Sequence, residues 1–521
     1  MLKWWANGIG PRNLESIGAQ AKKFTAGSSR TQFPETASIM QVVYSSESNR
    51  RVVGRSGRLV AYLTTVAVGS GARVFGLGSQ FVVLIMLSRI LPKDDFGDLM
   101  TAFGFYRLSA AALGVGISLV LLYHIARSPD DRAAEVMLHR YSAAVSTALA
   151  AGIALAGFLL AGPIAHTLHK PGLMAWLQQL APFAIFSTLL TTSTGALEGR
   201  SRVSESIALG EVAPNAVRIA LLPTVAWFHL PEAYVAHAIT LSVFIPWLWS
   251  GRRLWDYSVT GWRPWSRWDL SYCGKFVAAT LFGNQLGAVD VLVASVLFPS
   301  EIVADYALAA RIAALYSFFQ LVLLKRFSPR VAHLIEAKDL MAMEQEYVFC
   351  RRLLVGFGAL TIAAILCVAP LLLPMFGEYA GMWRFLVWLA IPTFIQSFYE
   401  ASDRLLTIAG QANVPLVLTA ASFCVLVTMP FIVAPFIGRT AVVIAMIVSA
   451  FVFKPVAAAR VKAVFGLRTI RFEEMLMMGA GVAALVCYAM TGSVSAGVAT
   501  FLVLAIIGLY CCLSAIRRTT S

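Results

Sequence analysis

Long apolar segments recur along this chain and constrain its fold more than any other feature. From Leu59 onward each segment is about 18 to 28 residues long, which matches the ~20 residues that a helix needs to cross ~30 Å of hydrocarbon. With 58% hydrophobic and 13% charged residues, the 521-residue chain is too apolar for a soluble protein. We therefore expect an all-α polytopic membrane protein with about 14 (12–14) transmembrane helices. The expected spans are 60–88, 99–125, 139–162, 176–197, 204–228, 232–250, 273–298, 303–325, 352–376, 383–408, 413–435, 440–460, 474–491 and 494–515.

Lys and Arg are distributed unevenly between the two sets of loops that these spans define. If the N-terminus is cytoplasmic, twenty-four of the 42 Lys and Arg residues lie in cytoplasmic connections. Five lie on the opposite side, namely Arg89, Lys93, Lys170, Arg384 and Arg439. Because Lys and Arg resist translocation, this asymmetry predicts that both termini are cytoplasmic. The net charge of +15 is then a topology signal, and nucleic-acid binding is not needed to explain it.

Two segments outside the apolar runs have distinct compositions. Residues 1–58 are basic and rich in Ser and Gly, and no apolar segment of the signal-peptide type follows the charges. We expect a disordered cytoplasmic arm, with translation from Met40 rather than Met1 as an open alternative. The stretch WDYSVTGWRPWSRW, 255–268, pairs Trp with Arg, which is typical of a segment in the headgroup region of the inner leaflet.

A short motif occurs twice in the chain. SRILPKDDFGD at 88–98 and SVLFPSEIVAD at 295–305 keep Ser, Pro and Asp in register at an offset of 207 residues. LEGRSRVSES at 197–206 and DRLLTIAGQAN at 403–413 follow apolar runs at nearly the same offset. Six expected helices lie between the copies, so both halves enter the membrane in the same direction. This pattern predicts two six-helix lobes related by a parallel pseudo-two-fold repeat, with a site where the lobes face each other.

The repeat and the apolar runs together predict the domain organisation. We expect a cytoplasmic arm at 1–58, an N-terminal lobe at 59–250, an amphipathic cytoplasmic linker at 251–272, a C-terminal lobe at 273–460 and two additional helices at 461–521. The outward connections are all short, which favours transport over a reaction centre held in an extracytoplasmic domain.

Three arginines within the expected spans suggest a cationic cavity. An ionisable group near the bilayer centre costs about 2.5 to 3.5 kcal/mol, so by default it faces a cavity or a partner. Arg73, Arg107 and Arg311 lie inside the first, second and eighth spans, and the alternative for each is that the side chain reaches the headgroups. Planar guanidinium groups bind phosphate oxygens in a bidentate manner, so the expected cargo is anionic, with pyrophosphate as the leading group.

Further polar residues in the spans have open interpretations. Asp290 is either a coupling site for a proton or cation, or a salt-bridge partner of Arg73 or Arg311. Asn284 and Gln285 either line the cavity or support helix packing. Glu211 and Arg218 lie seven residues apart on one helix face and are expected to form an intramembrane pair. Glu400 and Asp403 are either gate residues or polar groups at a helix end. The dispersed cysteines and histidines suggest no metal site, and no cofactor is expected.

Several of these segments resemble the polysaccharide-biosynthesis flippases of the Wzx type. FGLGSQFVVLIMLSRILPKDDFGDL at 75–99 resembles the first helix and following loop of that family, within the multidrug/oligosaccharidyl-lipid/polysaccharide (MOP) exporter superfamily. DVLVASVLFPSEIVADYALAARI at 290–312 and RFSPRVAHL at 326–334 resemble the seventh and eighth helices, and GALEGRSR at 195–202 resembles the exit of the fourth helix. Ala304 departs from the family, which usually has Gly there, and the family usually has twelve helices.

The resemblance implies a fold and a function. The expected fold is a two-lobed V shape like that of MATE and MurJ transporters. The expected function is to move undecaprenyl-pyrophosphate-linked oligosaccharide repeat units across the bacterial inner membrane by alternating access, for exopolysaccharide, capsule or O-antigen assembly. In the related MurJ-type lipid II flippases, cationic residues on the first, second and eighth helices line the cavity, which are the helices of Arg73, Arg107 and Arg311.

The resemblance leaves partners and two alternative functions open. A coupling ion, either proton or sodium, and the polysaccharide polymerase and export machinery are expected partners. A MATE-like multidrug exporter is one alternative, although a net-positive cavity suits its usual cationic substrates poorly. A membrane polysaccharide polymerase or ligase is less favoured, because this chain has no long outward loop with clustered Arg and His, so we expect a transporter and not an enzyme.

Overall fold

The computed structural model describes residues 75–76, 78–127, 131–200, 202–256, 258–379, 381–467 and 471–520, which form helices and turns and no strand. The expectations for 1–58 and for Arg73 fall outside the described residues. The N-terminal helices are Gly78–Ile90, α5 (Lys93–Arg127), α6 (Arg132–Leu159), α7 (Ala161–Thr167), α8 (Pro171–Gln179), α9 (Ala181–Gly199), α10 (Val203–Ile207), α11 (Ala213–Trp227) and α12 (Ala233–Ser250). The later helices are α13 (Arg267–Gly283), α14 (Asp290–Leu297), α15 (Ser300–Ala313), α16 (Phe318–Glu336), α17 (Leu340–Leu372), α18 (Met382–Ile408), α19 (Asn413–Ile437), α20 (Ala441–Phe465), α21 (Phe472–Thr491) and α22 (Val494–Thr520).

The length and composition of these helices confirm a polytopic membrane protein. Within the described residues, seven helical segments are long and apolar enough to cross a membrane, or up to nine if each of two bent helix pairs is one span. One of the seven, Asn413–Phe465, contains both α19 and α20. The exact number of crossings, expected to be about 14, stays a prediction.

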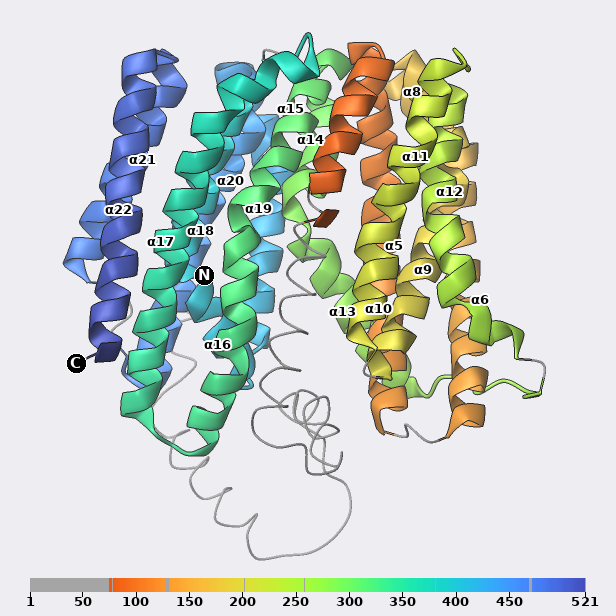
Figure 1. Cartoon of the computed structure of the whole chain (residues 1–521), viewed down its shortest axis with the longest axis horizontal. Helices are drawn as coiled ribbons and strands as arrows, with labels where there is room; N and C mark the ends of the chain where they lie inside the picture. The colour runs from red at the N-terminus through yellow and green to blue at the C-terminus, as the bar shows by residue number, and fades with distance from the viewer. Residues whose placement is uncertain are drawn as a thin grey trace, which may run out of the picture.

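The helices form two lobes that lie side by side (Figure 1). In the N-terminal lobe, α9 packs against α5, α6 and α12. In the C-terminal lobe, α18 packs against α15, α17, α20 and α21. We call the upper face the side of the molecule where α5 begins, at Lys93, and where α15 begins, at Ser300 (Figure 1). The lower face is the side where α5 ends and where the C-terminus lies. The expected two-lobed helical architecture is therefore confirmed.

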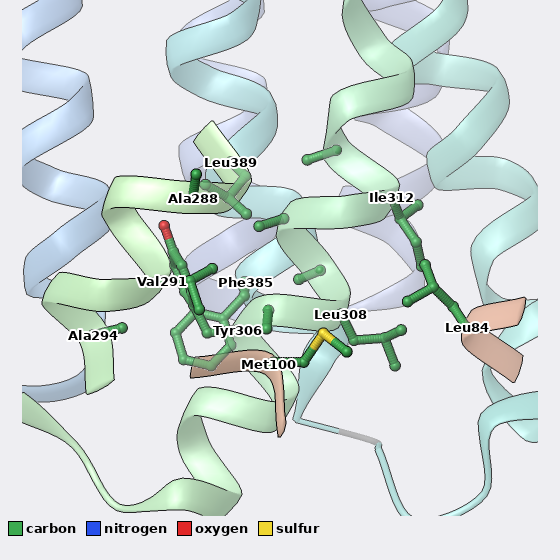
Figure 2. Packing of buried hydrophobic residues seen from close by; sticks show 14 of the residues in the cluster. Leu84, Met100, Ala288, Val291, Ala294, Tyr306, Leu308, Ile312, Phe385 and Leu389 are labelled. Atoms are coloured by element: carbon green, nitrogen blue, oxygen red, sulfur yellow. The ribbon is translucent and has the colours of Figure 1, made fainter. Parts of the chain in front are cut away.

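One apolar core connects the lobes at the upper face. It includes Met100 from α5, Ala288 and Val291 near α14, Tyr306 from α15 and Phe385 from α18, all buried (Figure 2). The Tyr306 and Phe385 rings meet edge to face, with centroids 5.4 Å apart. Since buried apolar side chains are packed at this junction, the two lobes are in close contact on the upper side.

The helix expected at 273–298 is bent and not straight. Helix α13 ends at Gly283, and the segment Gln285–Leu297, which contains α14, leaves it at an angle of 87°. Leu286 has extended backbone angles, and Gly287 has a φ of +75°, a region that favours glycine because it has no Cβ. Both halves contact α5 and α19, but α13 packs mainly on α5, whereas most neighbours of α14, namely α15, α19 and α20, belong to the C-terminal lobe.

The last two helices, α21 and α22, pack on the C-terminal lobe. At the crossing of α17 and α22, Gly356 and Gly508 face each other so closely that a Cβ on either would lie 3.0 to 3.1 Å from the other's carbonyl oxygen. Small residues at such a crossing let two membrane helices approach closely. Deeper toward the lower face, Arg351 of α17 donates to both carboxylate oxygens of Glu474 in α21, at 2.7 and 2.9 Å.

Candidate functional site

Three arginines from three helices gather where the lobes meet, and two of them lie beside one aromatic ring. Arg218 of α11 and Arg311 of α15 lie beside the ring of Phe103 in α5, with guanidinium carbons 5.7 and 5.5 Å from its centroid. Arg107 lies one turn after Phe103 on α5, close enough to Arg218 for mutual repulsion. We call Arg107, Arg218 and Arg311 the arginine cluster. Both lobes contribute to it, because α5 and α11 belong to the N-terminal lobe and α15 to the C-terminal lobe.

The arginine cluster lies deep within the apolar helices. Arg107 is 14 residues after Lys93, so it lies ~21 Å along α5 at ~1.5 Å per residue. Arg311 is 11 residues after Ser300, or ~17 Å along α15 by the same rise. Arg107 is nevertheless exposed, whereas Arg311 is buried and Arg218 is half-buried. A charged side chain that is accessible at this depth lies in a cavity or at the lipid boundary of the helices.

In the part of the chain that the structure describes, no carboxylate pairs with the arginine cluster. Arg218 donates from Nε to Ser242 Oγ (2.9 Å) and from Nη1 to Asn215 Oδ1 (3.3 Å), which are both uncharged. Among the residues that the structure describes, no ion pair joins any of the three arginines to a carboxylate, so the expected pairing of Arg218 with Glu211 is not confirmed. Because concentrated charge of one sign is costly away from water, the site favours an anionic ligand.

Asp290 is placed differently from the arginine cluster. It is fully buried at the start of α14, and its carboxylate accepts hydrogen bonds from the Tyr306 hydroxyl (2.8 Å) and from the backbone amides of Gly287, Ala288 and Val291. These bonds hold the bend between α13 and α14. Its expected coupling role stays a prediction.

Asn284 and Gln285 hydrogen-bond within and across the same bend. Asn284 Nδ2 donates to the Thr280 carbonyl at 2.9 Å. Gln285 donates to the Thr419 carbonyl at 3.2 Å and accepts from the Ser422 hydroxyl at 3.1 Å, which connects the bend to α19. These bonds favour the packing interpretation of both residues.

A second group of charges lies in the C-terminal lobe, toward the lower face. Lys454 of α20 contacts Asp403 Oδ2 at 2.6 Å and Glu400 Oε2 at 3.4 Å, both from α18. Sequence reasoning found the two acids but not their cation. This group holds α18 and α20 together and carries a net charge of −1 when all three are ionised.

Sequence reasoning did not group Arg218 with the other two arginines, and it gave Phe103 no role. The i, i+7 spacing from Glu211 suggested a local ion pair for Arg218, and a Phe in an apolar run carries no signal of its own. The position of Arg218 along its helix could have indicated its place in the cluster. Arg218 lies 9 residues before the upper end of α11 at Trp227, and Arg107 and Arg311 also lie well inside their helices.

The fold is similar to those of solved membrane transporters. The chain matches the "inward-facing conformation of a multidrug resistance MATE family transporter of the MOP superfamily" at 17% identity over 74% of this chain and 94% of that one, with a TM-score of 0.62. It matches the outward-facing conformation of such a transporter at 17% identity, covering 76% and 95%, with a TM-score of 0.57. It matches "Lipid II flippase MurJ, inward closed conformation" at 11% identity, covering 86% and 97%, with a TM-score of 0.64.

Family profiles give the classification. At these low identities the likenesses show a shared fold, that of the MATE and MurJ transporters. The profile described as "Polysaccharide biosynthesis protein" matches residues 63–326, just over half of the sequence, and the MatE profile matches 277–433. The chain therefore belongs to the family of polysaccharide biosynthesis proteins. No curated protein matches the sequence significantly.

Proposed function

We propose that this protein is a flippase that moves oligosaccharide repeat units linked to undecaprenyl pyrophosphate across the bacterial inner membrane. The observation that carries the proposal is the arginine cluster, whose three positive charges lie deep in the apolar helices without a carboxylate partner among the described residues. The profile description points to polysaccharide synthesis, and one structural neighbour is named a lipid II flippase. We assign the lower face and both termini to the cytoplasm, from the distribution of Lys and Arg.

The arginine cluster suits a diphosphate because of its shape as well as its charge. A guanidinium group binds phosphate oxygens with two parallel hydrogen bonds, and two adjacent phosphates offer acceptors to more than one such group. Phe103 fixes Arg218 and Arg311 on its ring, which reduces the conformational entropy lost on binding. Since both lobes supply an arginine, a bound diphosphate contacts both lobes, and its free energy of binding depends on their relative position.

A liposome assay tests the proposal directly. Purified protein is reconstituted with a fluorescent undecaprenyl-pyrophosphate oligosaccharide, and an added glycosidase cleaves only sugars in the exposed leaflet. We expect cleavage to pass the exposed fraction with the wild type. Arg107→Ala, Arg218→Ala and Arg311→Ala should each slow it about 10- to 150-fold, since a hydrogen bond to a charged group contributes about 1.5 to 3 kcal/mol. Arg132→Ala is the matched control, because that side chain is 70% exposed at the lower face.

The assay distinguishes a failure of the flippase assignment from a failure of the role given to the arginine cluster. Equal cleavage in protein-containing and empty liposomes, with several lipid-linked sugars and with imposed proton and sodium gradients, would refute the flippase assignment. Wild-type cleavage that persists in all three arginine variants would refute the role of the arginine cluster alone.

Multidrug export is the second candidate function. The MatE profile match over 277–433 and the multidrug transporter neighbours favour it. The arginine cluster argues against cationic drugs, because like charges repel in a medium of low dielectric. Efflux of a cationic dye that depends on the wild-type protein would favour this candidate over the flippase.

A further inference from the structure

The repeated motif lies at the upper contact between the lobes. Helix α5 begins within the first copy and α15 begins within the second, and the two helices pack together (Figure 1). Lys93 Nζ contacts Asp305 Oδ2 at 3.0 Å, and the Ser300 hydroxyl donates a short hydrogen bond to Asp98 Oδ1. Each contact therefore joins one copy of the motif to the other.

The two contacts are equivalent under the repeat. At the offset of 207 residues, Lys93 corresponds to Ser300 and Asp98 corresponds to Asp305. The donor position of each copy therefore contacts the acid position of the other copy, in both directions. Such a reciprocal arrangement is what a two-fold axis generates when it passes through a contact.

The backbones approach closely at the same place. A Cβ on Gly97 would lie 2.0 Å from the Ser300 carbonyl oxygen, so only glycine permits this packing. Its counterpart in the second copy is Ala304, which is fully buried. The close approach keeps both acids away from water, since Asp98 is 5% and Asp305 is 8% exposed.

Further contacts join the lobes around these pairs. The Lys93 ammonium lies 5.5 Å from the centroid of the Tyr379 ring, and the ring of Phe96 meets that of Tyr379 edge to face at 5.5 Å. Arg89 donates to the carbonyls of Pro374 and Met375, at 2.7 and 2.8 Å. The upper contact thus combines buried polar pairs and buried aromatic rings with an exposed arginine.

We propose that Lys93, Asp98, Ser300 and Asp305 form a reciprocal clasp that holds the upper face closed and opens as one unit during transport. The pseudo-two-fold axis relates the two contacts, so a rotation of the lobes that lengthens one also lengthens the other. Two contacts of modest strength then break together, which makes opening cooperative. Opening returns both carboxylates to water, so the open state has no buried unpaired acid. The inference rests on the alternating access of the proposed function and not on its substrate.

Distance measurements between spin labels test the clasp without any substrate. Labels at Leu160→Cys in one lobe and Phe436→Cys in the other report the separation of the lobes, because both positions are exposed near the upper face. Native cysteines that react with the label are replaced first. In reconstituted full-length protein, we expect Lys93→Met and Ser300→Ala each to lower the ratio of closed to open populations several-fold, and the double variant at least tenfold.

Matched controls come from the repeat itself. Asp94 and Glu301 also correspond at the offset of 207, lie beside the clasp residues and are exposed. Asp94→Asn with Glu301→Gln should therefore leave the population ratio within twofold of the wild type. Asp98→Asn and Asp305→Asn keep the side-chain shape and provide a second pair of variants if the first pair melts at a lower temperature.

The results separate the clasp from simpler alternatives. An unchanged distance distribution in folded Lys93→Met/Ser300→Ala protein would overturn the proposal, and it would leave the flippase assignment untouched because the measurement contains no lipid-linked sugar. A shift on changing Lys93 alone, with none on changing Ser300, would overturn the reciprocity. A population shift in both single variants, with the control unchanged, supports the clasp.

Discussion

The buried pair between Arg351 and Glu474 gives the clearest stability prediction. Arg351 is 1% exposed, and its Nη2 group contacts both oxygens of Glu474. Glu474→Gln keeps the volume but removes the charge, so the Arg351 guanidinium becomes an uncompensated buried cation. Breaking a buried pair in this way costs about 3 to 5 kcal/mol. We expect the free energy of unfolding of Glu474→Gln to fall by that amount.

The neighbouring arginine makes the prediction more specific. Arg352 Nε lies 3.7 Å from Glu474, so in Arg351→Met the acid keeps one partner and the cost should fall to about 2 to 3 kcal/mol. In the double variant Arg351→Met/Glu474→Gln no charge of the pair remains, and the loss should be smaller than the sum of the single losses. Denaturant titration in detergent micelles, followed by circular dichroism, measures these values. A loss below about 1 kcal/mol for Glu474→Gln would refute the reasoning, because the pair would then be effectively solvated.

Three further predictions follow from single residues. Gly97→Ala should separate the lobes at the upper face, because the added Cβ meets the Ser300 carbonyl, and the spin-label distances should therefore lengthen. Gly152→Ala is the control and should leave these distances unchanged, because the space around Gly152 is open. Phe103→Leu should raise the apparent KM for the lipid-linked sugar several-fold in the glycosidase assay, since each cation–π contact contributes about 0.5 to 1 kcal/mol; an unchanged KM would contradict a positioning role. Burial lowers the pKa of Lys170 to about 8, partly opposed by Asp98, so its charged form destabilises the fold below that pH. Lys170→Met should then stabilise the protein at pH 7 by about 2 to 3 kcal/mol, with the gain lost as the pH rises from 8 to 10.5; a gain that does not depend on pH would point to packing instead.

The sequence predicted the fold better than it predicted the site. The length of the apolar segments and the 207-residue repeat were sufficient to predict a two-lobed helical membrane protein. Helices that cross the lipid bilayer and an internal duplication both produce recurring patterns in a sequence. Arg107 and Arg311 were found from their depth. Arg218 was assigned to Glu211 because neighbours on one helix are visible in a sequence, whereas Ser242 and Phe103 reach it only through tertiary packing.

The bend in the seventh span was beyond sequence reasoning for a similar reason. Gly287 stands in an apolar run, where glycine usually marks close helix packing, and only the backbone angles reveal its left-handed conformation. For Asp290 the sequence left a coupling site and a salt bridge with an arginine open, and the structure adds bonds from Tyr306 and from the amides of the bend. The coupling role of Asp290 stays a prediction.

The bend also changes where the moving parts of the protein meet. Helix α13 packs mainly on α5 of the N-terminal lobe, while α14 packs mostly on α15, α19 and α20 of the C-terminal lobe and also contacts α5. If the lobes rotate as rigid bodies, the chain crosses from one body to the other inside this helix pair, near Gly287, and not in the surface loop before Arg267. The seventh span then acts as a tether whose joint lies within the membrane, so the torsion angles of a few residues limit how far the transporter opens.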